Sequence, residues 1–315
     1  MDPAALLTDV FRDVFAWVVF GTFLLGVVVA HWDRRTARTV TVGAWVMFAL
    51  FWLWYVPFFA FEHRSIIQAV LAAVGVPLSL FVGYHLAKGR DSLLLLSKAV
   101  GFMGLIYLPF ETIPLLHDTL IEIVARQVEI GIRMLGYDPT IDYNEAGLRN
   151  IILFEHESGA TFGSVIIFAC TGIGSMAIFG GLIAAVDEPL RKRVAALAFT
   201  VSIIWVLNIA RNVFIAVSHG QQLFHHELIV GPVMFLFGLN SPTRVSFFFS
   251  DRIVSQLLAI VVLVAIFWVV MRILPRLTTI VEDLLFLITG DEFDIQIVDG
   301  SIVVEEPESA ASIDG

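Results

Sequence analysis

The sequence predicts an all-α polytopic membrane protein with about seven transmembrane helices, its N-terminus outside the membrane and a small acidic cytoplasmic C-terminal tail. The 315 residues are 58% hydrophobic and 15% charged, whereas soluble domains carry about 25% charged residues. The mean hydropathy is +0.87. A net charge of −10 and a single cysteine argue against nucleic-acid binding and exclude both an intramolecular disulfide and a CxxC metal or redox site.

Apolar runs near the length of about 20 residues that a helix needs to cross a bilayer predict the spans. They lie at 14–30, 39–61, 66–87, 93–116, 161–186, 194–217 and 253–275. We expect the first to be retained and not cleaved as a signal peptide, because acidic residues precede it and the basic stretch 31–35 follows it. An eighth apolar segment, 228–239, contains Gly231-Pro232 and is too short to span comfortably, so it is predicted to be short or re-entrant.

Basic residues in short loops predict the orientation, because such loops stay on the cytoplasmic side. The odd-numbered spans are followed by basic clusters: Arg34, Arg35 and Arg38; Lys88 and Arg90; Arg191, Lys192 and Arg193; Arg272 and Arg276. The alternate loops, near Arg64 and over 218–242, are nearly free of positive charge. All four clusters lie on the cytoplasmic side only if the N-terminus is outside and the C-terminus is inside.

The longer outer segment, 117–160, begins with an amphipathic helix. Apolar residues recur at helical spacing from Leu120 to Leu135, opposite charged residues from Glu122 to Arg133. Two placements stay open: the helix lies on the outer membrane surface, or it packs beneath a loop.

The chain is predicted to divide into a membrane-embedded domain, 1–276, and an acidic tail, 277–315. The tail contains an amphipathic stretch, 277–290, and then two alternating runs around Asp299-Gly300, which predict a β-hairpin. Only three of the nineteen basic residues are lysine, a composition that suits a high-salt cytoplasm.

Three chemically special residues converge on the outer side of the predicted membrane domain. Cys170 lies roughly 9 residues, or ~14 Å, below the outer edge of the fifth span, and Arg211 lies about 6 residues, or ~9 Å, below the end of the sixth. Arg252 opens the seventh span. An arginine inside a span costs at least ~2.5–3.5 kcal/mol and is normally paired or functional.

Each of the three residues also has a plain structural interpretation. Cys170 can be a small buried hydrophobe, Arg211 can extend to the headgroups, and Arg252 can be an interfacial arginine beside Asp251. The functional interpretation rests on electrostatics. A fixed positive charge favours the nucleophilic thiolate and stabilises an oxyanion where water is excluded.

Nearby residues support the functional interpretation. Asn208, one helical turn before Arg211, is predicted to orient its guanidinium. Thr171, Gly172, Gly174 and Ser175 are small enough for another helix or a substrate backbone to approach Cys170 closely. A Cys–His mechanism would need His219, His225 or His226. No metal site is predicted, because adjacent histidines such as those at 225–226 seldom bind one ion.

The motifs ACTGIGS, NIARN and SDRIVSQ, on successive predicted spans, resemble the exosortase/archaeosortase family over about residues 10–275. The family has arginine or histidine at the position of Arg252 in the third motif, and the arginine here resembles the archaeal branch of the family. The resemblance implies a cysteine transpeptidase without a cofactor, with Cys170 as the nucleophile that forms an acyl-thioester. It implies Arg211 as proton donor or thiolate partner and Arg252 as transition-state stabiliser.

The resemblance also implies the partners. Substrates would be membrane proteins with a C-terminal sorting signal, composed of a Pro-Gly-Phe motif, a transmembrane helix and a basic end, such as the surface-layer glycoprotein. An amine-bearing membrane lipid would be the acceptor, and the active site would face the extracytoplasmic side of the cell membrane.

Two other classes of function stay open at the level of sequence. In an anion or small-molecule transporter, Arg211 would bind the anion and segment 228–239 would line a pathway. A non-catalytic scaffold for envelope assembly would need none of the three residues.

Overall fold

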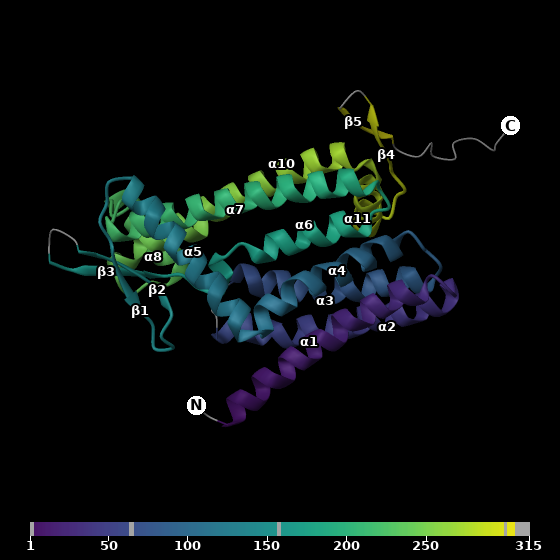
Figure 1. Ribbon diagram of the computed structural model, residues 1–315, viewed down its shortest axis with the longest axis horizontal. Helices are drawn as coiled ribbons and strands as arrows, with labels where there is room; N and C mark the ends of the chain where they lie inside the picture. The colour runs from purple at the N-terminus through teal and green to yellow at the C-terminus, as the bar shows by residue number, and fades with distance from the viewer. Residues whose placement is uncertain (1–2, 63–65, 156–158, 299–300, 306–315) are drawn as a thin grey trace. The chain divides into compact units, whose positions relative to one another are not determined.

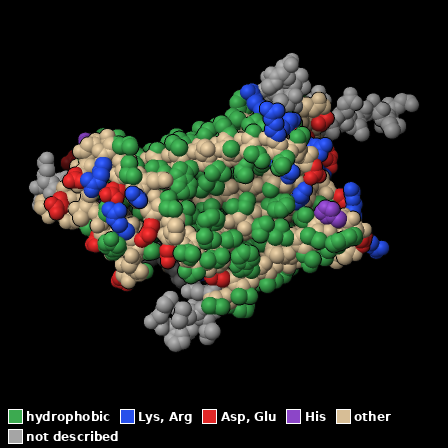
Figure 2. Space-filling model, in the orientation of Figure 1, with side chains coloured by type: hydrophobic (Ala, Val, Ile, Leu, Met, Phe, Trp, Pro, Cys, Tyr) green, Lys and Arg blue, Asp and Glu red, His purple; other side chains and the backbone are tan. Residues whose placement is uncertain are grey.

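The computed structural model describes residues 3–62, 66–155, 159–298 and 301–305. The chain forms two compact units. The first comprises residues 1–108, 177–197 and 270–315, and the second comprises 109–176 and 198–269. Within the described residues, six helices are long and apolar enough to cross a membrane. Hydrophobic side chains cover much of the middle of the face shown in Figure 2. The class of polytopic helical membrane protein is therefore confirmed.

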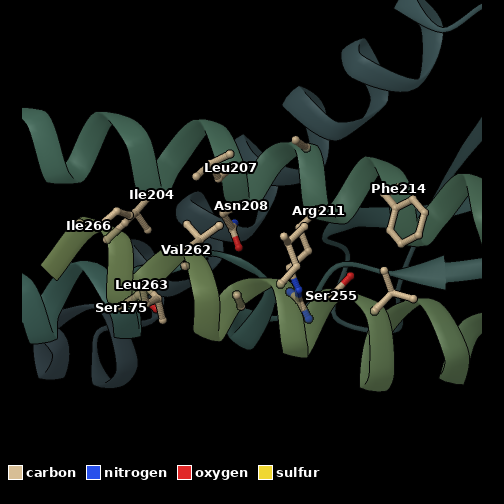
Figure 3. A pocket seen from close by; sticks show the side chains of 15 residues that line it. Ser175, Ile204, Leu207, Asn208, Arg211, Phe214, Ser255, Val262, Leu263 and Ile266 are labelled. Atoms are coloured by element: carbon tan, nitrogen blue, oxygen red, sulfur yellow. The ribbon is translucent and has the colours of Figure 1, made fainter. Parts of the chain in front are cut away.

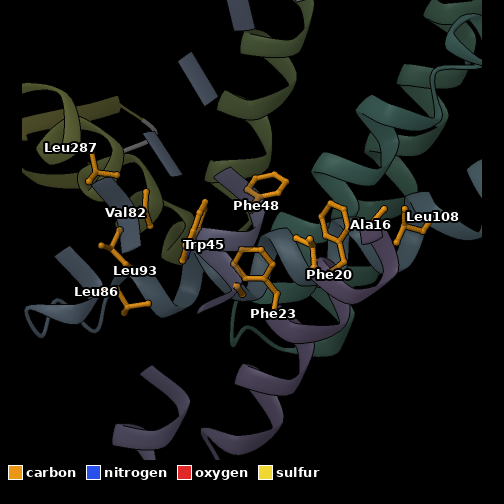
Figure 4. Packing of buried hydrophobic residues seen from close by; sticks show 12 residues of the cluster. Ala16, Phe20, Phe23, Trp45, Phe48, Val82, Leu86, Leu93, Leu108 and Leu287 are labelled. Carbon is orange, nitrogen blue, oxygen red and sulfur yellow. The ribbon is translucent and has the colours of Figure 1, made fainter. Parts of the chain in front are cut away.

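The first unit contains three helices from the N-terminal part of the chain, α1 (Pro3–Val29), α2 (Arg34–Pro57) and α3 (Ile66–Ala87). It also holds most of α4 (Leu93–Thr112) and parts of α6 (Ile173–Ala185), α7 (Leu190–Gly220) and α10 (Gln256–Ile273) (Figure 1). Its core is largely aromatic, with Phe20, Phe23, Trp45 and Phe48 packed edge to face (Figure 4).

The predicted β-hairpin in the tail is confirmed. Strands β4 (Asp294–Val298) and β5 (Ser301–Glu305) pair antiparallel, with Val298 opposite Ser301. The turn at 299–300 lies outside the described residues. The preceding helix α11 (Thr278–Thr289) packs into the first unit, because its Leu287 joins the aromatic core. A functional boundary at residue 276 stays a prediction.

Ion pairs within the first unit connect the loop after α1, the loop after α3 and the tail. Arg38 donates to Asp91 at 2.7 Å. Arg90 donates to the buried Asp283 of α11 at 2.8 Å and to Glu292 at 2.6 Å. Carboxylates thus pair with one arginine from each of two basic clusters and connect these segments.

The remaining basic loops meet at Asp187, between α6 and α7. Its carboxylate pairs with Lys98 at 3.1 Å, and its backbone carbonyl accepts a hydrogen bond from Arg276 at 2.6 Å. All four loops that the sequence predicted to share one side of the membrane therefore belong to the first unit. The identity of that side stays a prediction.

The second unit contains an antiparallel sheet that the sequence analysis missed. Strands β1 (Thr140–Tyr143), β2 (Arg149–Glu155) and β3 (Thr161–Val165) lie in the order β1-β2-β3. Alternate side chains of β2 are buried, which is the two-residue period of a sheet with one covered face. The run RNIILFE carries this signal, but it is short and lies within the outer segment 117–160, for which the sequence predicts only a helix.

Helix α5 (Pro114–Met134) covers that sheet (Figure 1). Its predicted apolar face is confirmed, and Val124, Val128 and Ile132 pack on Ile152 and Phe154 of β2 in one cluster that also includes residues of α7. Of the two placements left open, the structure therefore has the packed helix.

The predicted fifth span, 161–186, is wrong in its first half. Residues 161–165 form β3, Phe168–Cys170 form a single 3-10 turn, and only Ile173–Ala185 are α-helical. Apolar composition alone did not distinguish a strand and a turn from a spanning helix. The correction places Cys170 ahead of a helix and not inside one.

The helical segment that contains the predicted seventh span starts earlier than residue 253. The helical segment begins at Pro242 and continues through α9 (Val245–Phe248), a π-helical segment (Phe249–Ser255) and α10. Arg252 therefore lies inside this segment. The apolar segment 228–239 forms the short helix α8 (Glu227–Phe237), which ends at Gly238 in the left-handed conformation. Whether α8 is re-entrant stays a prediction.

Candidate active site

Cys170 lies at a tight turn between β3 and α6, and the residues after it explain the turn. Gly172 has φ +76°, and a Cβ at this position would lie 3.0 Å from Cγ of Asn208. The buried Thr171 donates its hydroxyl to the carbonyl of Phe168 at 2.7 Å. A larger residue at 172 would be strained twice, through its backbone and through its side chain.

Two asparagines of α7 hold the backbone of Cys170. Nδ2 of Asn208 and Nδ2 of Asn212 each donate a hydrogen bond to the Cys170 carbonyl oxygen at 2.7 Å. The sequence predicts that Asn208 orients the Arg211 guanidinium, but in the structure the amide of Asn208 donates to the Cys170 carbonyl. Asn212 was missed, although its spacing of four residues from Asn208 puts both side chains on one helix face.

Arg211 reaches across to the π-helical segment and pairs with Asp251, at 2.5 Å between Nη2 and Oδ1. Arg252 lies 3.3 Å from the other oxygen of the same carboxylate. The Asp251 side chain is 15% exposed, half as much as either arginine. Sequence reasoning treated Asp251 only as a neighbour of Arg252, and the tertiary structure makes it the common partner of both guanidiniums.

Burial disfavours ionisation of the Cys170 thiol, and the charges of these three residues act on it in addition. The two guanidiniums favour the thiolate, and the carboxylate of Asp251 opposes them. The arrangement can therefore stabilise an anion beside Cys170, whether a thiolate or an oxyanion.

Two of the three histidines considered as bases, His219 and His226, make other contacts. His219 lies between the rings of Phe162 and Phe247, at centroid distances of 5.7 and 5.6 Å. His226 accepts the backbone N–H of Leu228 at the start of α8.

A groove of about 320 Å³ adjoins the cluster. One wall is α7, with Ile204 and Leu207, and the other is α10, with Leu258, Val262 and Ile266 (Figure 3). Its polar lining includes Asn208, Arg211 and Ser255.

Fold and site together define a multi-pass membrane protein whose single cysteine lies beside a cluster of two arginines and an aspartate. The chain matches the family model for transmembrane exosortases over residues 10–242, a range that includes Cys170 and Arg211 and ends before Arg252. The chain therefore belongs to the exosortase family.

Two archaeal relatives are similar over most of their length. Archaeosortase A of Haloferax volcanii is 48% identical over 294 residues, which cover 90% of this chain and 96% of the relative. Archaeosortase A of Natronomonas pharaonis is 47% identical over 287 residues, which cover 89% and 90%. No solved structure matches.

Proposed function

We propose that this chain is a membrane-embedded cysteine transpeptidase that processes proteins bearing a C-terminal sorting signal and transfers them to a membrane lipid. One observation carries the proposal. The helix that holds the Cys170 backbone through Asn208 and Asn212 also carries Arg211, whose partner Asp251 binds Arg252 as well. The similarity to archaeosortases supports a sortase-like processing enzyme.

In the first step, the Cys170 thiolate attacks the carbonyl carbon of the scissile peptide. The C–S bond of the thioester forms, the C–N bond breaks, and the departing amine takes up a proton equivalent to the one that left the thiol. The intermediate carries an oxyanion, which a guanidinium in a water-poor site can stabilise. Because the pKa of a guanidinium lies above about 12, we assign both arginines an electrostatic role in preference to proton donation.

In the second step, the amine of the acceptor lipid attacks the thioester carbonyl. A C–N bond forms, the C–S bond breaks, and the proton released by the amine replaces the one that Cys170 lost. The expected substrates carry a Pro-Gly-Phe motif, a transmembrane helix and a basic end, and the surface-layer glycoprotein is the expected example.

We place the site at the extracytoplasmic side of the cell membrane. Arg193, near the start of α7, belongs to one of the four basic loops that share the first unit. Arg211 follows it by 18 residues in the same helix, a distance of about 27 Å along the axis. The hydrocarbon core is about 30 Å thick, so a cytoplasmic Arg193 places Arg211 near the opposite surface.

The direct test is to trap the intermediate. Purified protein incubated with a substrate tail should form an adduct on Cys170 that hydroxylamine releases, as expected of a thioester. A hydroxylamine-resistant adduct, or none at all while the substrate is still cleaved, would refute the proposed chemistry.

A further inference from the structure

Strand β3 is an outer strand of the three-stranded sheet, so only one of its two edges is paired with β2. The N–H of Ile166 donates to the Asn150 carbonyl at 2.9 Å. Backbone groups along a strand alternate between its two edges, so those of Ser164, opposite β2, also face β2. The N–H and C=O groups of Gly163 and Val165 therefore face the other edge, where no hydrogen bond from the described residues reaches them.

The two outer edges of this sheet differ in how they are protected against further pairing. Natural sheets block an exposed edge with charged side chains, proline or a bulge. The outer strand β1 has all three, because Pro139 precedes it, Asp142 lies within it and its register shifts between Asp142 and Tyr143. Strand β3 has the sequence TFGSV, which contains no charge and no proline, and its register with β2 is regular. The outer edge of β3 is therefore open to another strand.

The open edge leads directly to the candidate nucleophile. The chain stays extended as far as Ile167, with φ −111° and ψ 172°, and Phe168–Cys170 then form the 3-10 turn. The N–H of Cys170 donates to the Ile167 carbonyl at 2.8 Å. A further strand would lie about 4.8 Å from β3. A peptide that pairs with residues 163–167 therefore has its next residues beside the turn that carries the thiol.

The chemistry of this edge favours an extended polypeptide as its occupant. A row of N–H and C=O groups is matched by the backbone of another strand. A hydrocarbon chain has no such groups, and a helix uses its own for internal hydrogen bonds. In the proposed reaction, the substrate segment next to the scissile bond is the polypeptide that has to reach Cys170.

We propose that the outer edge of β3 binds the substrate segment on the N-terminal side of the scissile bond as a fourth strand, parallel to β3. The direction follows from chain order. The acyl part of the substrate precedes the carbonyl that Cys170 attacks, just as β3 precedes Cys170. The proposal rests on the proposed transpeptidase function and adds how the enzyme binds the substrate's backbone.

The test identifies the substrate positions that lie opposite β3, in a Cys170→Ala background where no chemistry is required. Val165 and Ile167 are 48% and 46% exposed, so Val165→Cys and Ile167→Cys each provide one accessible thiol at the edge. The probe is a synthetic peptide with the Pro-Gly-Phe motif and a transmembrane helix, carrying a single cysteine at successive positions before the motif. Because side chains of a strand alternate between its faces, oxidation by copper–phenanthroline should crosslink every second position at least fivefold more strongly than its neighbours.

The same variants test the direction of the added strand. In a parallel arrangement, the strongest position with Ile167→Cys lies two residues closer to the peptide's C-terminus than with Val165→Cys, and the opposite shift would contradict the proposal. Tyr143→Cys is the matched control, because Tyr143 is 59% exposed on the strand at the other edge of the sheet, and its crosslinking should be at least tenfold weaker. Equal crosslinking at successive positions, or from Tyr143→Cys, would refute the site. A disulfide-linked dimer of Val165→Cys that the peptide does not displace would assign the edge to a second copy of the chain.

A proline variant with the native cysteine tests the edge through activity. Val165→Pro removes an N–H that faces the open edge and is not bonded to β2, a position that proline tolerates in an edge strand. Cleavage of the peptide should fall at least tenfold in Val165→Pro and stay within twofold of the wild type in Val165→Ala, which keeps the N–H. Thr161→Pro makes the same change about 13 Å farther along the strand and should also stay within twofold. Equal rates in the two proline variants would refute pairing at 163–167.

The two measurements separate this proposal from the proposed chemistry. If the wild type forms the thioester but crosslinking shows no alternation, the site is refuted and the transpeptidase stands. If crosslinks alternate in the expected direction but the wild type does not convert the peptide, the binding site stands and the transpeptidase is refuted. An absence of crosslinks at every position refutes the site in either case.

Discussion

Arg211 of α7 and Asp251 of the π-helical segment form an ion pair at 2.5 Å, although forty residues separate them in the sequence. The guanidinium is therefore directed toward a carboxylate that also binds Arg252. Exposed ion pairs contribute little to stability, but this carboxylate is largely covered, and electrostatic interactions strengthen as water is excluded.

Cys170→Ala and Cys170→Ser should both abolish substrate processing. Serine is similar in size and replaces the thiol with a hydroxyl, but that hydroxyl is a weak nucleophile without an adjacent base. The measurement is the C-terminal processing and lipid content of a substrate in cells that contain only the variant. A transporter should tolerate both changes, so normal processing by either variant would favour that class or a scaffold.

Arg211→Lys should insert at near-normal abundance yet process substrate at least ~10-fold more slowly, a loss of ~1.4 kcal/mol in transition-state stabilisation. Lysine keeps the charge but loses the planar array of five donors. Arg244→Lys is the matched control, because Arg244 lies over the ring of Phe248 and has no assigned role. Wild-type rates in Arg211→Lys would mean that Arg211 only reaches toward the headgroups.

Asp251→Asn should separate thiol reactivity from catalysis. Removing the negative charge leaves two guanidiniums that favour the thiolate, so alkylation of the single cysteine by iodoacetamide should proceed at lower pH than in the wild type. Processing should nevertheless fall at least ~10-fold, because the arginines lose their common partner. Asp251→Glu should recover part of the activity.

A purely structural role for Asp251 would give another result. Alkylation and processing would then both follow the loss of folded protein, and the pH dependence of alkylation would not move. That result would reduce Asp251 to a packing residue.

Gly172→Ala should lower both thermal stability and processing. A left-handed backbone costs a non-glycine residue about 1–2 kcal/mol, and the new Cβ would also press on Asn208. Gly136→Ala is the control, since Gly136 has φ +88° but open space around it. Equal loss of processing in the two variants would show that the Asn208 contact is unimportant.

The orientation can be measured independently of activity. A reporter fused after Gly315 should be cytoplasmic, and a cysteine at position 145 in a Cys170→Ala background should react with an impermeant maleimide in intact cells. Labelling at 145 only after membrane rupture would invert the topology and place Cys170 on the cytoplasmic face.

Local patterns in the sequence were enough for the membrane class, most spans, the amphipathic face of α5 and the tail hairpin. Each of these features depends on the composition or periodicity of neighbouring residues. Burial in lipid or in protein directly requires such a composition or periodicity. The positions of Cys170, Arg211 and Arg252 as candidates also came from the sequence, since a charge or thiol among apolar residues is visible without coordinates. Their catalytic roles stay predictions.

Contacts between distant segments were decided only by the tertiary structure. Asp251 follows a serine in an apolar region, and nothing local pairs it with Arg211 in preference to the adjacent Arg252. The support of Cys170 by Asn208 and Asn212, the sheet at 140–165 and the true start of the helix containing Arg252 were hidden for the same reason. Apolar composition reports that a segment is buried, but the partner that buries it depends on how the whole chain packs.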